Sequence, residues 1–303
     1  MKKKVLLLIY LFPIYVFSQK EIYIKDFKTK KELPYATINF LQKNKGLYTN
    51  ERGVFLLPEI KSDSIEISYI GYDSLKFKAS KIKDTIFLRQ SSIILSEIEI
   101  NTGKSKEKVI GYIRKKKNLS WHIKKKTELA TLIRYNKYYK DAYIKKIFIP
   151  ISKEGGIKKG NIWESDFPDF RSVFRVHLYS NSEGKPNKSV LKNSILIECD
   201  QNSSNILEID ITDEFIKFPK EGVFVGVEMI GVLDNNGSIS NNKSSILPSF
   251  KFTKKKEKNI SSISYIKIIF LGNNWISIKN RKDFTHVSEY NMAVSLTLDI
   301  YKK

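Results

Sequence analysis

The chain has few of the residues that build disulfide, redox or metal sites. It contains one cysteine and three histidines among 303 residues. A single cysteine excludes an internal disulfide framework, so stability has to come from buried apolar cores. Cys199 ends the run Ile195–Cys199, where a small hydrophobic side chain on a β-strand is expected. A reactive thiol is not expected, because neither a histidine nor a helix start lies nearby in the sequence.

Long hydrophobic runs are absent after the first 18 residues, and these 18 residues are organised as a secretory signal. Met1–Lys4 is basic, Val5–Phe17 is a 13-residue apolar segment, and Ser18 is a small residue at the expected cleavage point. A membrane span needs about 20 apolar residues. We therefore expect export with cleavage after Ser18, and an uncleaved anchor is the alternative. Gln19 stands where a lipoprotein needs cysteine, so the protein is not expected to be a lipoprotein.

Acidic residues are in the minority. The chain has 54 Lys and Arg against 32 Asp and Glu, a net charge of +22, and removal of residues 1–18 leaves +19. The densest basic run is Lys104–Lys126, with ten Lys or Arg and one acid, Glu107. Such a balance suits a polyanionic partner, but export argues against nucleic acid. The run is interpreted as a solvated connector, or as a contact for acidic polysaccharide or an anionic membrane surface.

The pattern that is present is that of short β-strands. In Ser64–Ile70 the apolar side chains Ile65, Ile67 and Tyr69 alternate with polar ones, which is typical of a half-buried strand. Asn50–Gly53 has Asn at the first and Gly at the fourth position of a type I turn. Amphipathic helical windows of useful length are absent. Strands and turns at this spacing predict an all-β sandwich or barrel-like unit.

A second β-rich unit follows the basic run. Ser172–Tyr179 alternates in the same way, and His177 lies on its more polar face, where a solvated or hydrogen-bonded histidine is expected. Asn181–Asn187 (NSEGKPN) predicts a long polar turn. The expected organisation is a signal peptide at 1–18, a β-sandwich at 19–101, a basic connector and first strand at 102–126, and a second β-sandwich at 127–303.

Three motifs in a fixed order give the first unit a family resemblance. They are Leu33–Ile38 (LPYATI), Tyr48–Phe55 (YTNERGVF) and Ile67–Tyr72 (ISYIGY). Together they resemble the carboxypeptidase-regulatory-like domain, which implies a transthyretin-like (prealbumin-like) β-sandwich over about Lys20–Ile100. This family is common in exported proteins of Bacteroidetes-type bacteria and often extends the N-terminus of TonB-dependent outer-membrane receptors. It has no catalytic residues of its own to carry over.

The second unit has a resemblance of lower specificity. Phe174–Tyr179, Gly184–Pro186 and Phe218–Glu228 are similar to the C-terminal half of uncharacterised exported proteins that carry the same N-terminal domain. This similarity implies a larger, jelly-roll-like β-sandwich. It brings no function with it.

Catalytic motifs are missing as well. His286 and Glu289 have the His-x-x-Glu spacing of zinc carboxypeptidases, but no histidine follows as third ligand, and residues three apart on a strand point to opposite faces. Glu164, Asp166 and Asp169 lie beside Trp163, as in a glycosidase or a calcium loop. The interleaved aromatic residues indicate instead a loop that covers an edge of the core. We expect no catalytic residue, no metal site and no cofactor.

Three functions follow from this pattern. The first is an exported, non-enzymatic binding or scaffold protein of the bacterial cell envelope, with an envelope protein or a glycan as partner. The second is a carbohydrate-binding module that uses Trp163 or Trp275 as a sugar platform, with core packing as the alternative role of each tryptophan. The third is an enzyme of unrecognised type that uses acidic residues of the second unit.

Overall fold

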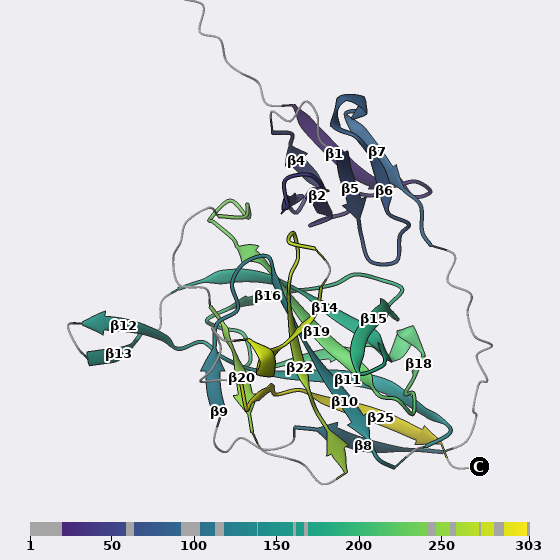
Figure 1. Cartoon of the computed structure of the whole chain (residues 1–303), viewed down its shortest axis with the longest axis vertical. Helices are drawn as coiled ribbons and strands as arrows, with labels where there is room; N and C mark the ends of the chain where they lie inside the picture. The colour runs from purple at the N-terminus through teal and green to yellow at the C-terminus, as the bar shows by residue number, and fades with distance from the viewer. Residues whose placement is uncertain are drawn as a thin grey trace, which may run out of the picture.

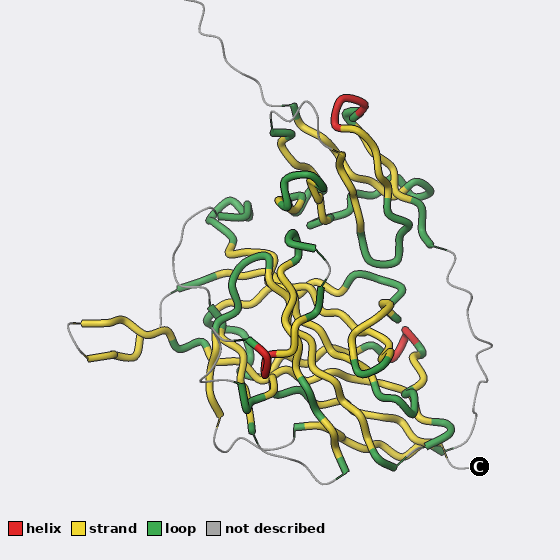
Figure 2. Tube along the Cα trace, viewed as in Figure 1, coloured by secondary structure: helices red, strands yellow, loops and turns green. Residues whose placement is uncertain are grey.

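The computed structural model describes residues 20–58, 64–91, 104–112, 118–137, 139–159, 162–166, 169–240, 247–254, 259–272, 274–281 and 288–301. Strands dominate this part of the chain, and its helical elements are short 3-10 turns (Figure 2): η2 (Ala79–Lys81), η3 (Thr212–Glu214) and η4 (Ile278–Asn280). Within the described residues no helix is long and apolar enough to cross a membrane. The all-β fold class expected from the sequence is confirmed.

The N-terminal unit is a sandwich of two small sheets (Figure 1). One sheet has the order β4 (Val54–Leu56), β1 (Glu21–Asp26) and β7 (Thr85–Leu88), and the other has the order β3 (Lys45–Tyr48), β2 (Thr37–Phe40), β5 (Ser64–Ser68) and β6 (Leu75–Lys78). The two inner faces share one apolar core, to which alternate residues contribute: Ile22, Ile24, Ile38, Phe40, Ile65, Ile67 and Leu88. The period-two interpretation of Ser64–Ile70 is therefore confirmed for Ile65 and Ile67, which are fully buried.

The turn before β4 has the chemistry that the sequence predicts. The Asn50 side-chain oxygen accepts the backbone N–H groups of Arg52 and Val54 at 3.0 and 2.9 Å. Gly53 adopts a φ of +68°, and a Cβ there would lie 2.8 Å from the carbonyl oxygen of Ile24. A side chain at this position would be strained and crowded at once. The glycine thus allows β4 to return against β1.

The C-terminal unit contains two larger antiparallel sheets. The first has the order β15 (Lys185–Ser189), β14 (Arg171–Ser182), β19 (Val223–Val232), β10 (Thr127–Tyr135), β22 (Ser264–Ile268) and β23 (Ile276–Ser277), with β16 (Ile195–Asp200) beside β14 and β21 (Ile260–Ser261) beside β10. The second has the order β24 (Asn291–Met292), β20 (Ser249–Thr253), β11 (Ala142–Ser152), β25 (Ser295–Tyr301) and β8 (Ser105–Gly111), with β17 (Ile206–Asp210) and β18 (Ile216–Lys217) beside β11 and β9 (Asn118–Trp121) beside β20.

Successive long strands alternate between these two sheets. β10, β14, β19 and β22 belong to the first sheet, and β11, β17, β20 and β25, which follow them in turn, belong to the second. This alternation is the connectivity of a jelly roll, and it places one large apolar core between the sheets. Cys199 is buried in this core, as the sequence predicts, and burial raises the pKa of its thiol.

Two segments differ from their sequence prediction. Asn181–Asn187 is not a long turn, because only Glu183 and Gly184 turn the chain and β15 begins at Lys185. Pro186 is accommodated there because β15 is an edge strand that pairs with β14 alone. In its described residues, the basic run Lys104–Lys126 forms two strands, β8 and β9, where the sequence predicts one, and both belong to the second sheet.

A hairpin formed by β12 (Gly155–Lys159) and β13 (Ile162–Asp166) projects from the C-terminal unit (Figure 1). Its two strands pair with each other in a separate two-stranded sheet. Gly155 and Gly156 are paired with Asp166 and Ser165.

Candidate functional site

The N-terminal unit lies on the outer face of the first sheet of the C-terminal unit. Along β14 the side chains of Phe174, Val176 and Leu178 enter the large core between the sheets. The alternate side chains point to the opposite face, which is the face that the N-terminal unit covers. This outer face carries an unusual set of polar residues from four strands: the buried Arg175, His177 and Tyr179 of β14, Glu228 of β19 and Glu128 of β10, and the half-buried Lys267 of β22.

An apolar cluster seals one side of this contact. Tyr35 and Tyr48 of the N-terminal unit pack with Val173, Ile230 and Leu233. The Tyr48 ring also contacts the ring of Phe270, with centroids 5.5 Å apart. Gly46 of β3 has no space for a side chain, because a Cβ there would collide with the Phe270 ring. Close approach of the two units thus depends on a glycine on one side and an aromatic ring on the other.

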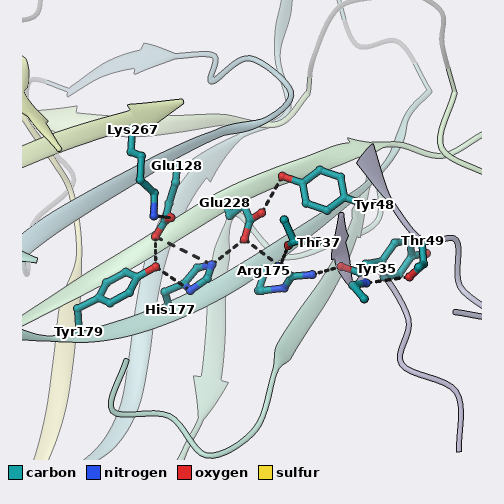
Figure 3. A network of polar contacts seen from close by, with 11 residues as sticks. Tyr35, Thr37, Tyr48, Thr49, Glu128, Arg175, His177, Tyr179, Glu228 and Lys267 are labelled. Atoms are coloured by element: carbon teal, nitrogen blue, oxygen red, sulfur yellow. Dashed lines mark hydrogen bonds and ion pairs between the residues drawn. The ribbon is translucent and has the colours of Figure 1, made fainter. Parts of the chain in front are cut away.

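Glu228 is the centre of the polar contact between the units (Figure 3). The residue is 2% exposed, and its Oε1 accepts the Tyr48 hydroxyl at 2.7 Å. Its Oε2 accepts Arg175 Nη1 at 3.1 Å and lies 2.7 Å from His177 Nε2. Both carboxylate oxygens are therefore engaged, one of them by the N-terminal unit.

Arg175 joins the units a second time. It is 2% exposed, and its Nη1 also donates to the Thr37 hydroxyl at 3.2 Å, while its Nη2 donates to the backbone carbonyl of Tyr35. Its guanidinium lies over the Tyr48 ring, 5.9 Å from the centroid. One cation thus bridges a buried carboxylate of its own unit and two neutral acceptors of the other.

The network continues away from the interface through His177. The Tyr179 hydroxyl donates to Glu128 Oε1 at 2.8 Å and lies 2.9 Å from His177 Nδ1. Since this hydroxyl has a single hydrogen, it can only accept from the imidazole while it donates to Glu128. Both ring nitrogens of His177 then face acceptors, a pattern that an imidazolium satisfies. At the far end of the network, Lys267 Nζ forms an ion pair with Glu128 Oε2 at 2.9 Å.

The surroundings hold Glu228, Tyr48 and Tyr179 each in one protonation state. Burial by itself would raise the pKa of Glu228, but the Arg175 guanidinium and the His177 and Tyr48 hydrogen bonds outweigh it and hold that pKa well below its usual range. Burial, reinforced by the neighbouring Glu228 carboxylate, raises the pKa of the Tyr48 hydroxyl well above its ordinary value. Burial and Glu128 do the same for Tyr179. The glutamate thus stays ionised and the tyrosines stay neutral.

Lys126 of the basic run also contacts this interface, and its neighbour Lys125 makes a contact within the C-terminal unit. Lys126 Nζ donates to the carbonyl of Gly46 at 2.8 Å, and Lys125 Nζ donates to the carbonyl of Ser240 at 2.5 Å. Burial lowers the pKa of both lysines, and for Lys126 the positive charges of Lys125 and Lys45 add to this effect. The end of the Lys104–Lys126 run is therefore part of a packed contact.

The residues that the sequence marks as possible ligand contacts lie apart from this network or at its end. Trp275 is half buried, and its ring meets Lys267 Nζ at 4.4 Å and packs edge-on to Tyr179. Trp163 lies on β13 in the projecting hairpin, and its side chain is outside the described residues.

Of the two residues with zinc-ligand spacing, His286 and Glu289, the structure describes only Glu289. His286 lies outside the described residues, and Glu289 forms an ion pair with Lys254 at 3.1 Å. In the part of the chain that the structure describes, no three His, Cys, Asp or Glu side chains gather as metal ligands would.

Sequence reasoning missed the charged members of the network, although a signal for them exists. Glu228 lies in VFVGVEMIGV, a strand whose other residues are apolar or glycine, and Glu128 lies in the more mixed strand TELATLIRY. A lone carboxylate in such a strand has to find a partner when it is buried. The pairing itself cannot be seen in the sequence, because Tyr48 and Glu228 are 180 residues apart.

The fold and the site define an all-β protein of two sandwiches joined by a buried polar network. Comparison with family models matches residues 23–101 to the CarboxypepD_reg-like domain. This match supports the family resemblance of the N-terminal unit.

Comparison with curated proteins finds no match. Among solved structures, the chain is similar to the cysteine protease and lectin-like domains of Cwp84, a surface layer associated protein of Clostridium difficile, with 11% identity and a TM-score of 0.36. The similarity covers 86% of this chain and 50% of the other. A likeness this distant carries no argument about function.

Proposed function

We propose that this protein is an exported, non-enzymatic scaffold or binding protein of the bacterial cell envelope, in which the two sandwiches act as one rigid body. The observation that carries this proposal is the network centred on Glu228. It is buried, its charges are paired, and it takes hydrogen-bonding groups from both units. A buried network of this kind favours one relative orientation of the units over others.

The state of the network argues for a structural role rather than a catalytic one. A general acid or base works best when its pKa is close to the operating pH. In this network the pKa of Glu228 is shifted down and those of Tyr48 and Tyr179 are shifted up, away from neutrality in each case. The same groups are also nearly inaccessible to a substrate. Their chemistry suits a fixed contact between units.

The setting of this role is inferred from the sequence. The signal-like segment at residues 1–18 supports export, and the CarboxypepD_reg-like match at 23–101 supports an accessory module of the type found in Bacteroidetes-like envelope proteins. A carbohydrate ligand at Trp275 is less favoured, because Lys267 and Tyr179 already contact its ring.

The test uses the full chain without its predicted signal segment. Small-angle scattering compares the wild-type protein with Arg175→Met, which breaks the network, and with Arg171→Met, which removes an exposed arginine of the same strand paired with Glu198. The expected result is one compact shape for the wild type and Arg171→Met, and a broader distribution for Arg175→Met.

Three further measurements address binding and catalysis. Pull-down from envelope fractions should recover the same partner with the wild type and Arg171→Met, and less of it with Arg175→Met. Hydrolysis of peptide, ester or glycoside substrates by the purified protein would refute the non-enzymatic role. Glycan binding that is lost in Trp275→Ala would instead support the carbohydrate-binding alternative.

A further inference from the structure

An exposed patch of two phenylalanines and two cations lies on the N-terminal unit. It consists of Phe27, Lys30, Phe87 and Arg89. Phe27 follows β1 directly and Phe87 lies on β7, and their rings are 6.4 Å apart in an edge-to-face arrangement. They are 44% and 37% exposed. Large apolar side chains that cluster in this way on a surface are candidates for a contact site.

The cations of the patch are held above the rings. Lys30 Nζ lies 4.7 Å from the Phe27 centroid and 4.5 Å from the Phe87 centroid, and the Arg89 guanidinium lies 4.3 Å from Phe27. Among the described residues, no carboxylate is within ion-pair distance of either cation. The neighbouring Lys25 differs in this respect, because it is paired with Glu32 at 3.2 Å. The patch therefore combines exposed apolar area with two positive charges that have no anionic partner there.

The patch belongs to a sheet face that the rest of the described chain leaves uncovered. Ile22 and Ile24 of β1 point into the core, so Tyr23 and Lys25 point outward, and Lys25 pairs with Phe87 in the register of β1 and β7. The described contacts with the C-terminal unit come instead from β2 and β3, from the residues next to them, and from Tyr69–Gly71 at the end of β5. Figure 1 accordingly places β1 and β7 on the side of the N-terminal unit away from the C-terminal unit.

We propose that this patch binds an anionic membrane surface. Phenyl rings partition into the headgroup boundary of a bilayer, and Lys and Arg side chains at the same level reach the phosphate groups. An acidic protein segment would pair with the cations but leave two phenyl rings in water, so a lipid surface accounts for more of the patch. The net charge of +19 that remains without residues 1–18 adds a long-range attraction to an anionic surface. This inference uses no residue of the buried network and is independent of the scaffold role.

Vesicle co-sedimentation of the full chain without its predicted signal segment tests the proposal. The wild type should bind vesicles that contain phosphatidylglycerol, more weakly at high salt, and should bind pure phosphatidylcholine vesicles poorly. Lys30→Gln with Arg89→Gln should lower the affinity by about fivefold per cation. Phe27→Ala with Phe87→Ala should lower it by about tenfold, with the salt dependence retained.

The matched control lies on the C-terminal unit. Lys254 is an exposed lysine 5.0 Å from the ring centroid of Tyr290, and Leu271 is 58% exposed. Lys254→Gln with Leu271→Ala should leave vesicle binding unchanged. All variants should keep the wild-type melting temperature, because the substituted side chains are exposed. Equal loss in the control, no binding to phosphatidylglycerol, or preferential binding to polyglutamate would each overturn the proposal.

Discussion

Removal of the Arg175 charge is the most direct test of how the two units are held together. Arg175→Met keeps an unbranched apolar stem and deletes the ion pair with Glu228 at 3.1 Å, together with the hydrogen bonds to Thr37 and to the backbone of Tyr35. Breaking a buried pair by removing one partner costs about 3–5 kcal/mol, because it leaves an uncompensated charge in the interior. The exposed pair of Arg171 with Glu198 should contribute much less, because solvent screens it.

Urea unfolding of the two variants provides the measurement. We expect one cooperative transition for the wild type and for Arg171→Met, and an earlier loss of the interface in Arg175→Met. Adding Glu228→Gln to Arg175→Met removes the orphaned charge and should recover about 1–3 kcal/mol. If Arg175→Met costs no more than Arg171→Met, or if the two substitutions are additive, the network does not fix the units and the scaffold proposal loses its main support.

The same variant should change the acid stability of the protein. In the wild type the pKa of Glu228 is held well below its ordinary value of about 4.3. A lowered pKa contributes stability above the ordinary value, and this contribution is lost only as the pH falls through the folded-state value. Without Arg175 the carboxyl group loses a stabilising charge, so acid unfolding of the variant should begin at a higher pH. An identical acid profile would contradict the assigned role of Arg175.

Three other predictions concern this interface and the network behind it. Tyr48→Phe deletes a hydrogen bond to the ionised Glu228, so it should cost about 1.5–3 kcal/mol in urea unfolding, and a neutral result would mean that water replaces the hydroxyl. Gly226→Ala places a Cβ 2.7 Å from Glu128 Oε1 and should cost about 1–3 kcal/mol, whereas an unchanged midpoint would show that the network shifts freely. Burial raises the pKa of Tyr35 to about 12, so stability should be present below pH 10 and fall as the pH approaches 12. Tyrosinate absorbance follows this change, and complete ionisation near pH 10 would disprove it.

Local features of the fold could be predicted from the sequence because short-range chemistry decides them. The alternation in Ser64–Ile70 and the turn at Asn50–Gly53 depend on residues that are close together in the chain. The length of a turn was harder to predict. NSEGKPN has the composition of a loop, yet Lys185–Ser189 forms an edge strand, where Pro186 needs no ladder donor and β14 supplies the pairing.

The site could not be predicted in the same way, because each of its contacts joins distant segments. His177 was expected to be solvated or hydrogen-bonded, and it is hydrogen-bonded and 7% exposed. The reason is that the N-terminal unit covers the polar face of β14. Which face of a strand is covered depends on the docking of whole sheets, and a period-two pattern reports only that the two faces differ.

The two units contribute to the interface unequally, and this has a consequence for their independence. The described charges at its centre, Arg175 and Glu228, belong to the C-terminal unit, and Tyr48 and Thr37 offer neutral hydroxyl groups from the N-terminal unit. When the units separate, the N-terminal one hydrates a few neutral groups, while the C-terminal one exposes an ion pair that water solvates well. The polar network alone therefore sets orientation more than affinity. Much of the free energy that keeps the units together has to come from the apolar contacts of Tyr35, Tyr48 and Phe270.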